Sequence, residues 1–176
     1  PDPVDLHPVP GVAERWEVSA DGLTYTFHLR RDGKWSNGDP LTARDFLLSF
    51  RRALTPAFGS EYKDALYPVR GAEAFAKGEI KDFAATGFAA PDDHTVVITL
   101  ERPAAYFPTV LRANVCFPVH AASVERGGAR LDDRTGRWTL ARPFVGNGPF
   151  RLVEWKDHAH LEVERNPHYW DAARVR

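Results

Sequence analysis

The sequence is poor in residues that would cross-link the chain or hold it in a membrane. It contains one cysteine, Cys116, which cannot form a disulfide within the chain, so cysteine use neither supports nor excludes an oxidising compartment. No apolar run approaches the ~20 residues that span a bilayer, and no basic start followed by an apolar segment indicates a signal peptide. The chain opens at Pro1 and has no methionine. We therefore expect a processed or trimmed product, for which a missing signal says nothing against export.

An excess of charge of one sign is also missing. The 23 basic and 24 acidic residues give a formal net charge of −1, so the chain has no net positive field that would attract nucleic acid or an anionic membrane. Hydrophobic residues make up 43% of the chain and charged residues 27%, as in ordinary globular proteins. A length of 176 residues is enough for one or two compact units. We expect a folded protein with no nucleic-acid partner.

The short signatures of common catalytic mechanisms are absent as well. The sequence has no HExxH, P-loop, GxSxG or paired CxxC pattern. Cys116 and His120 lie four residues apart and would suit a nucleophile and its base, but the proline-containing run between them disfavours a helix that would make them face each other. The adjacent pairs Asp92-Asp93 and Asp132-Asp133 are typical of solvated turns. The sequence therefore favours a protein that is not an enzyme.

His158 and His160 come nearest to a metal-binding pattern. Residues two apart lie on the same face of a strand, and imidazole is a common zinc ligand. Further ligands are not evident in the sequence, and Asp157 places both histidines at a predicted hairpin turn. A solvated turn is the favoured interpretation, and we expect no metal site and no cofactor.

Hydrophobic periodicity and turn residues predict an α+β fold, in which an antiparallel sheet has flanking helices. Asp21-Gly22 supplies the positive φ of a hairpin turn, Thr42 followed by Asp45 predicts a helix start, and Gly78 suits a helix end. The expected strands are 15–18, 24–30, 95–100, 150–155 and 161–165, and the expected helices are 43–54, 69–77, 104–111 and 121–126.

The remaining segments give weaker patterns. Residues 115–118 are expected to be extended, and residues 131–144, which show no period, are expected to form a solvated loop. The five tryptophans would suit a ligand cage, but core packing is the favoured interpretation for Trp35 and Trp155.

Two ordered blocks of sequence carry a family resemblance. The first comprises residues 10–16 (PGVAERW), 34–38 (KWSNG) and 42–46 (TARDF), and the second comprises residues 146–150 (GNGPF) and 164–170 (ERNPHYW). Together they resemble the bacterial oligopeptide-binding proteins of ABC importers. Members of that family are several times longer than this chain, so the resemblance implies a fragment.

The resemblance implies a fold and a function. The fold is part of one lobe of a two-lobed periplasmic-binding-protein fold, with residues 1–119 as a small α+β subdomain and residues 120–176 as a segment of the larger first-lobe domain. The implied function is to bind oligopeptides between two lobes and deliver them to an ABC permease in the membrane, which requires no catalytic group. The implied location is periplasmic or otherwise extracytoplasmic, and a lipid anchor on the parent protein stays an open question.

The resemblance also places a few ligand contacts. Tyr62, after the first helix, matches a tyrosine that leans on the peptide backbone, and Asn114, Val115, Cys116 and Phe117 match a stretch that passes near the cleft. Another solute (a dipeptide, a nickel chelate or a sugar oligomer), a sensor role, a self-contained hydrolase and a purely structural interaction module remain as alternatives.

A fragment of a lobe is expected to expose surface that the rest of the lobe would cover. On the last hairpin we expect an apolar strip around Phe150, Leu152, Leu161 and Val163. Such exposure favours self-association of the fragment.

Overall fold

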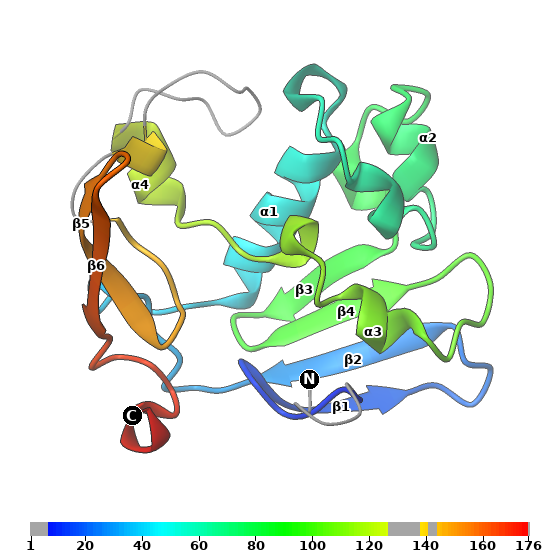
Figure 1. Cartoon of the computed structure of the whole chain (residues 1–176). Coiled ribbons are helices and arrows are strands. Elements are labelled where there is room, and N and C mark those ends of the chain that lie inside the picture. The colour runs from blue at the N-terminus through cyan, green and yellow to red at the C-terminus, as the bar shows by residue number, and fades with distance from the viewer. Residues whose placement is uncertain (1–6, 127–137, 141–143, 176) are drawn as a thin grey trace.

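The computed structural model describes residues 7–126, 138–140 and 144–175. An antiparallel sheet with helices on one side and a separate hairpin make up this part of the chain (Figure 1), which confirms the predicted α+β class. The strands are β1 (Ala13–Val18), β2 (Thr24–Leu29), β3 (Phe88–Asp92), β4 (Thr95–Thr99), β5 (Phe150–Lys156) and β6 (His160–Arg165). The helices are α1 (Ala43–Leu54), α2 (Ala72–Ala76), α3 (Phe107–Val110) and α4 (Ala121–Arg126).

The sheet has the strand order β1-β2-β4-β3, and every neighbouring pair is antiparallel. Tyr25 lies opposite Ile98, and Phe27 lies opposite Val96. The turn from β1 to β2 contains Gly22 with a φ of 71°, the positive value expected of its Asp-Gly sequence. The predicted hairpin and the predicted antiparallel sheet are therefore confirmed.

Both edge strands of this sheet are irregular. The pairing of β1 with β2 shifts register between Ala13 and Arg15, and the pairing of β3 with β4 shifts between Ala89 and Asp92. Pro91 lies within the second irregularity and has no N–H to give to a ladder. The outer sides of both strands are therefore poorly suited to further pairing.

The core lies between the sheet and α1. Buried and half-buried residues alternate along β2 and β4, as a strand with one covered face requires. Phe50 of α1 stacks on Phe88 of β3 with ring centroids 4.7 Å apart. Leu54 and Phe107 are completely buried, and each such side chain contributes about 1.5–3 kcal/mol through its removal from water.

Helix α1 begins and ends where its sequence predicts. The backbone N–H of Thr42, the N-cap, donates to Oδ2 of Asp45 at 2.7 Å, which satisfies a donor at the helix start. The helix ends at Leu54, and Pro56 opens the short 3-10 turn η1 (Pro56–Phe58). The predicted start and end of this helix are confirmed.

Helix α2 is shorter than the predicted helix at 69–77. Val69 forms an isolated β-bridge with Leu100, and Gly71 has a φ of 68°. The chain is therefore extended at Val69 and left-handed at Gly71, so that the helix can begin only at Ala72. Gly78 ends the segment with a φ of 78°, as predicted.

The prediction that residues 115–118 are extended is wrong for the first two of them. Residues Asn114–Cys116 form a 3-10 turn, η4, in which the backbone N–H of Cys116 donates to the carbonyl of Ala113 at 2.8 Å. The turn points Cys116 inward and leaves Phe117 exposed. The tight turn arises because an i to i+3 bond satisfies backbone groups that an unpaired extended segment would leave to water.

The other predicted helices are present in part or in full. α3 lies within the expected 104–111, and α4 has the predicted bounds 121–126. Most of the loop expected at 131–144 lies outside the described residues, apart from the 3-10 turn η5 (Trp138–Leu140) and the residues from 144 onward.

The hairpin of β5 and β6 has one apolar face and one charged face. A bulge between Leu152 and Glu154 shifts the register, so that Leu152 pairs with Val163 while Glu154 pairs with Glu162. The apolar face carries Phe150, Leu152, Trp155, Leu161 and Val163, with Arg165 opposite Phe150 at its end. The charged face carries Arg151, Glu154, Lys156, His160, Glu162 and Glu164.

The exposure of this apolar face confirms one prediction and corrects another. Phe150, Leu161 and Val163 are 45%, 56% and 46% exposed, as predicted, whereas Leu152, the fourth residue of the predicted strip, is half-buried. Trp155 is 58% exposed, so the prediction that it lies in the core is wrong: its side chain lies on the exposed apolar face of the hairpin. Trp35, in contrast, is 1% exposed, and its predicted core position is confirmed.

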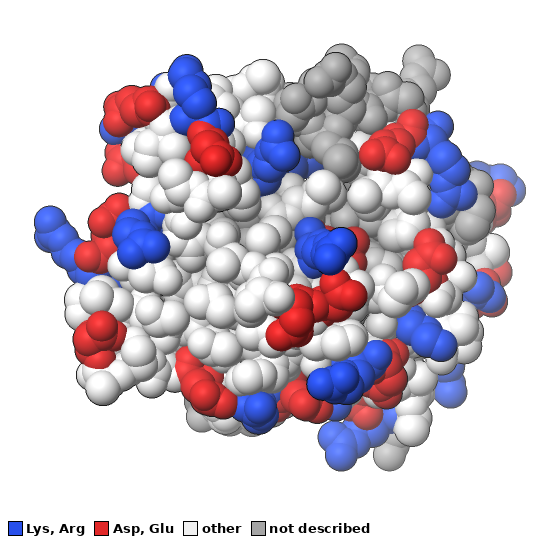
Figure 2. Space-filling model, turned by 180° about the vertical axis from the view of Figure 1, so that it is seen from behind, with Lys and Arg blue, Asp and Glu red and all other residues white. Residues whose placement is uncertain are grey.

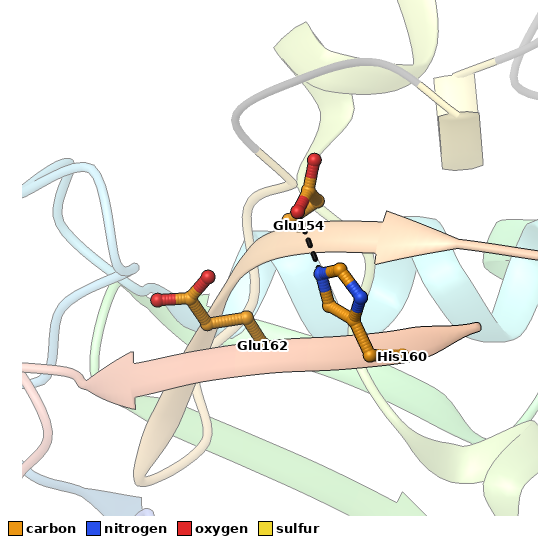
Figure 3. Close-up of side chains that lie close together, drawn as sticks. All are labelled: Glu154, His160 and Glu162. Carbon is orange, nitrogen blue, oxygen red and sulfur yellow. Dashed lines mark hydrogen bonds and ion pairs between the residues drawn. The ribbon is translucent and has the colours of Figure 1, made fainter.

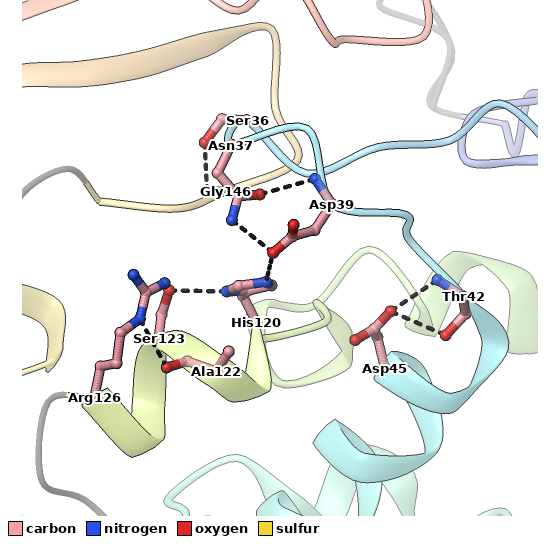
Figure 4. Close-up of polar contacts among 10 residues, drawn as sticks. All are labelled: Ser36, Asn37, Asp39, Thr42, Asp45, His120, Ala122, Ser123, Arg126 and Gly146. Atoms are coloured by element: carbon pink, nitrogen blue, oxygen red, sulfur yellow. Dashed lines mark hydrogen bonds and ion pairs between the residues drawn. The ribbon is translucent and has the colours of Figure 1, made fainter.

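The loop at residues 34–40, here called the junction loop, ties the sheet to the segments that follow it in sequence (Figure 4). Trp35 packs against the ring of His120, with centroids 5.2 Å apart. His120 Nε2 lies 2.9 Å from Asp39 Oδ2, and the backbone N–H of Ser36 donates to the carbonyl of Gly146 at 2.8 Å. One buried tryptophan and these polar contacts therefore hold α4 and the start of the last hairpin against the loop.

Charges of both signs are interspersed over the back of the molecule, around an uncharged central area (Figure 2). That face therefore lacks the single-sign field that nucleic acid requires. Among the described residues, no helix has the length and apolar character needed to cross a membrane.

Candidate functional site: an apolar groove beside the sheet

An open groove of about 570 Å³ lies between the sheet, α1 and the segment from α3 to η4. The sheet forms its floor with Phe27, Leu29, Val96 and Ile98, and α1 adds Phe46 and Phe50. The opposite wall and the N-terminal side contribute Pro8, Val9, Gly11, Val12, Ala13, Trp16, Pro108, Thr109, Leu111, Arg112, Cys116 and Phe117. Its volume lies within the range of small-molecule sites.

The wall formed by α3 is fixed to the sheet through one tyrosine. The hydroxyl of Tyr25 donates to the carbonyl of Ala104 at 2.8 Å, in a buried bond. The Tyr25 ring also contacts the Phe107 ring, with centroids 5.5 Å apart. Because Phe107 is the first residue of α3, these contacts set the position of the helix and of the groove wall that follows it.

The lining of the groove is almost entirely apolar. Arg112 is the charged side chain that lines it within the described part of the chain, and Thr109 adds a hydroxyl. Apolar walls with a single cation favour a ligand, or a ligand side chain, that is largely apolar. The groove also has room at its edge for an acidic group on that ligand. The groove is thus suited to binding a ligand through the burial of apolar ligand surface.

The predicted contact residues divide between the groove and its surroundings. Cys116 and Phe117 line the groove, whereas Asn114 is exposed and Val115 is half-buried beside them. Tyr62 is 69% exposed and lies outside the groove, directly before the 3-10 turn η2 (Lys63–Leu66). Since η2 packs against η4, Tyr62 and the 114–117 segment belong to one region of the surface. Contact of these residues with a ligand stays a prediction.

Cys116 is a packing residue in this site. Burial raises the pKa of its thiol to about 12, so the thiol stays protonated at neutral pH. The two ring nitrogens of His120 lie 2.8 Å from Ser123 Oγ and 2.9 Å from Asp39 Oδ2. With both nitrogens engaged elsewhere, His120 does not serve Cys116 as a base.

Sequence reasoning did not identify most of the groove. Phe46 and Phe50 were recognisable as the apolar side of a helix, and Leu111 as part of an apolar turn after Pro108. Such patterns indicate which residues face inward, but they do not indicate where packing leaves a gap. Arg112 had no sequence signal at all.

The fold recurs in solved structures of peptide-binding proteins. The substrate-binding domain of an oligopeptide ABC transporter from Bacillus anthracis matches 97% of this chain with a TM-score of 0.85 and 36% identity, over 32% of its own length. OppA of Haemophilus influenzae, solved in complex with RPPGFSPFR, matches 93% of this chain with a TM-score of 0.80 and 35% identity, over 31% of its own length.

Curated proteins give the same result at the level of sequence. The dipeptide-binding protein DppE of Bacillus subtilis (strain 168) is 39% identical over 175 residues, and the periplasmic oligopeptide-binding protein OppA of Escherichia coli (strain K12) is 37% identical over 174. Each match covers 98% of this chain. The chain spans about 30% of the length of these relatives.

The antiparallel sheet with its flanking helices therefore has the fold of one part of these solute-binding proteins. The sequence profile described as "Bacterial extracellular solute-binding proteins, family 5 Middle" matches residues 7–176. The chain belongs to this family.

Proposed function

We propose that this chain is part of the solute-binding component of an ABC importer that takes up oligopeptides. The observation that carries the proposal is the match of nearly the whole chain to proteins named for peptide binding, at 35–39% identity. One of those structures holds a peptide, RPPGFSPFR. An apolar groove with one cation is consistent with binding by burial and without bond-making.

Residues 1–119 act in this proposal as a small subdomain of the first lobe, and residues 120–176 as a segment of its larger domain. The junction loop holds the two together through Trp35 and Asp39. A ligand that touches both lobes of the whole protein stabilises the closed form by the difference between its affinities for the two states. The chain then supplies one wall of the ligand cleft.

The peptide-facing surface comprises Tyr62 and the segment 114–117. Tyr62 and Phe117 are 69% and 55% exposed, which leaves their rings free to lie against a peptide main chain. Hydrogen bonds to the main chain, with roomy space for side chains, allow many sequences to bind.

The rest of the lobe covers the apolar face of the β5–β6 hairpin. A two-stranded hairpin is marginally stable by itself, and this one exposes several large apolar side chains. The whole protein works outside the cytoplasm, as the name of the E. coli relative indicates for that protein, and passes its ligand to a membrane permease.

Mass spectrometry of ligands retained by the full-length protein from a mixed peptide pool tests the proposal. Peptides of defined length are expected. Replacing Tyr62 with alanine is expected to weaken peptide affinity about tenfold, because aromatic contacts often dominate such interfaces. Val18→Ala is the control, since Val18 is also exposed, at 47%, but lies on β1 and not in the proposed surface. Retention of no peptide, or equal losses in both variants, would contradict the proposal.

A second candidate ligand is an apolar steroid acid. A probable deoxycholate-binding periplasmic protein of Escherichia coli (strain K12) is 36% identical over 166 residues, which cover 93% of this chain and 29% of that protein. The apolar groove with Arg112 at its lining would suit such a ligand. The same retention experiment separates the two, because a bile acid and a peptide differ in mass and fragmentation.

A further inference from the structure

The charged face of the last hairpin gathers three groups that bind transition metals. Glu154, His160 and Glu162 each offer one ligand atom, and these atoms all lie within 4.8 Å of one another (Figure 3). His160 Nε2 lies 2.7 Å from Glu154 Oε2. We propose that these three side chains form a surface binding site for a divalent transition-metal ion, with Zn²⁺ as the best-matched probe.

The geometry arises from the bulge in β5. Because the bulge shifts the register after Leu152, Glu154 pairs directly with Glu162 across the hairpin. His160 lies two residues before Glu162 on β6, so both side chains project from the same face. All three donors therefore come from two adjacent, hydrogen-bonded strands, which limits how far they can move apart.

Electrostatics favour a cation at this position. Two carboxylates directly opposite each other on antiparallel strands repel and destabilise the pairing. Lys156 Nζ lies 3.3 Å from Glu154 Oε1 and relieves part of this repulsion. Within the described part of the chain Glu162 takes part in no ion pair, and a divalent ion held between the strands would neutralise both carboxylates.

The donor set suits zinc. Zinc accepts imidazole nitrogen and carboxylate oxygen at about 2 Å, and open sites hold three protein ligands with a water as the fourth. That bond length places ligand atoms of a tetrahedral site about 3.3 Å apart. Small side-chain rotations would close the site, and these are available because His160 and Glu154 are 47% and 40% exposed.

The pair of histidines that the sequence singles out is not the ligand set. His158 is 94% exposed, has a φ of 57° in the hairpin turn, and lies 3.5 Å from Asp157 rather than near His160's partners. His160 instead meets two glutamates, one of them on the opposite strand. Pairing across strands created the cluster, and spacing along one strand could not reveal it.

Isothermal titration of the full chain with ZnCl₂ tests the proposal. One saturable equivalent is expected, and both His160→Ala and Glu162→Gln are expected to abolish saturable binding. His158→Ala is the matched control, because it removes a neighbouring imidazole that is outside the cluster. The affinity of this variant for Zn²⁺ is expected to stay within about twofold of that of the parent chain. Far-UV circular dichroism establishes that each variant is folded.

Two results would overturn the site. The first is Zn²⁺ binding by His160→Ala or Glu162→Gln that equals binding by the parent chain, and the second is loss of binding in His158→Ala. The test does not depend on peptide binding, so failure of the proposed transport function would leave its outcome unchanged.

Discussion

Two tryptophans illustrate how differently similar residues behave in this chain. Trp35 is 1% exposed and joins the junction loop to His120, whereas Trp155 is 58% exposed on the apolar face of the last hairpin. Replacing Trp35 with alanine is expected to lower the free energy of unfolding by about 3–5 kcal/mol, because a buried indole is lost and a cavity remains. Urea denaturation followed by circular dichroism measures the change.

Trp155→Ala is the comparison for that experiment. It is expected to change the free energy of unfolding of this chain by no more than about 0.5 kcal/mol, since the side chain is largely in water. A loss as large as that of Trp35→Ala would show that Trp155 is packed.

Sequence alone predicted a core position for both tryptophans and was right for one. Trp35 lies between two turns in a loop that folds back on itself, so its large apolar side chain can be buried. The prediction for Trp155 relied on strict alternation along β5, which the bulge after Leu152 interrupts. No composition rule marks that bulge, and the apolar face on which Trp155 lies is exposed, with Leu161 56% and Val163 46% exposed.

At the scale of elements, the contact between the junction loop and α4 predicts a pH dependence. A hydrogen bond from Asn37, and then the hydrogen bond and charge of His120, lower the pKa of Asp39 below its ordinary 3.8. The folded chain therefore binds a proton at Asp39 less readily than the unfolded chain does. The resulting stabilisation is present above the unfolded pKa and is lost as pH falls through the lower folded pKa.

Urea midpoints measured between about pH 5 and pH 2 test this linkage. The parent chain is expected to lose stability more steeply towards acid than Asp39→Asn, which has no carboxylate to protonate. Asp157→Asn, at the exposed hairpin turn, serves as the control and is expected to keep the parent's slope. Parallel slopes for the parent and Asp39→Asn would contradict the role of Asp39.

Elements were predictable where local chemistry and tertiary structure agree. The Asp-Gly turn of the first hairpin and the Thr42 cap of α1 are both in place. The start of α2 was not predictable, since the bridge from Val69 to Leu100 is a long-range contact. The groove escaped prediction for a related reason: it is a gap left between α1, the sheet and α3, and no single element encodes it.

At the scale of the whole molecule, the uncovered hairpin predicts self-association of this chain. Leu161 and Val163 project from the apolar face and are about half exposed, and contiguous apolar surface of this kind drives contact between copies. Light scattering is expected to give a mass that rises with concentration. The double variant Leu161→Ser, Val163→Thr is expected to remain monomeric over the same range.

Val18→Thr provides the control for that variant. Val18 is 47% exposed but lies on β1, away from the hairpin, so its replacement is expected to leave the concentration dependence unchanged. A monomeric parent chain at every concentration would refute the prediction.

The irregular outer strands of the four-stranded sheet determine what such assemblies can become. Fibril growth requires a straight strand with free ladder groups onto which the next molecule can add. β1 is bent near Ala13, and β3 is interrupted at Pro91, so neither offers that template. Self-association of this chain should therefore not proceed by extending the four-stranded sheet through β1 or β3.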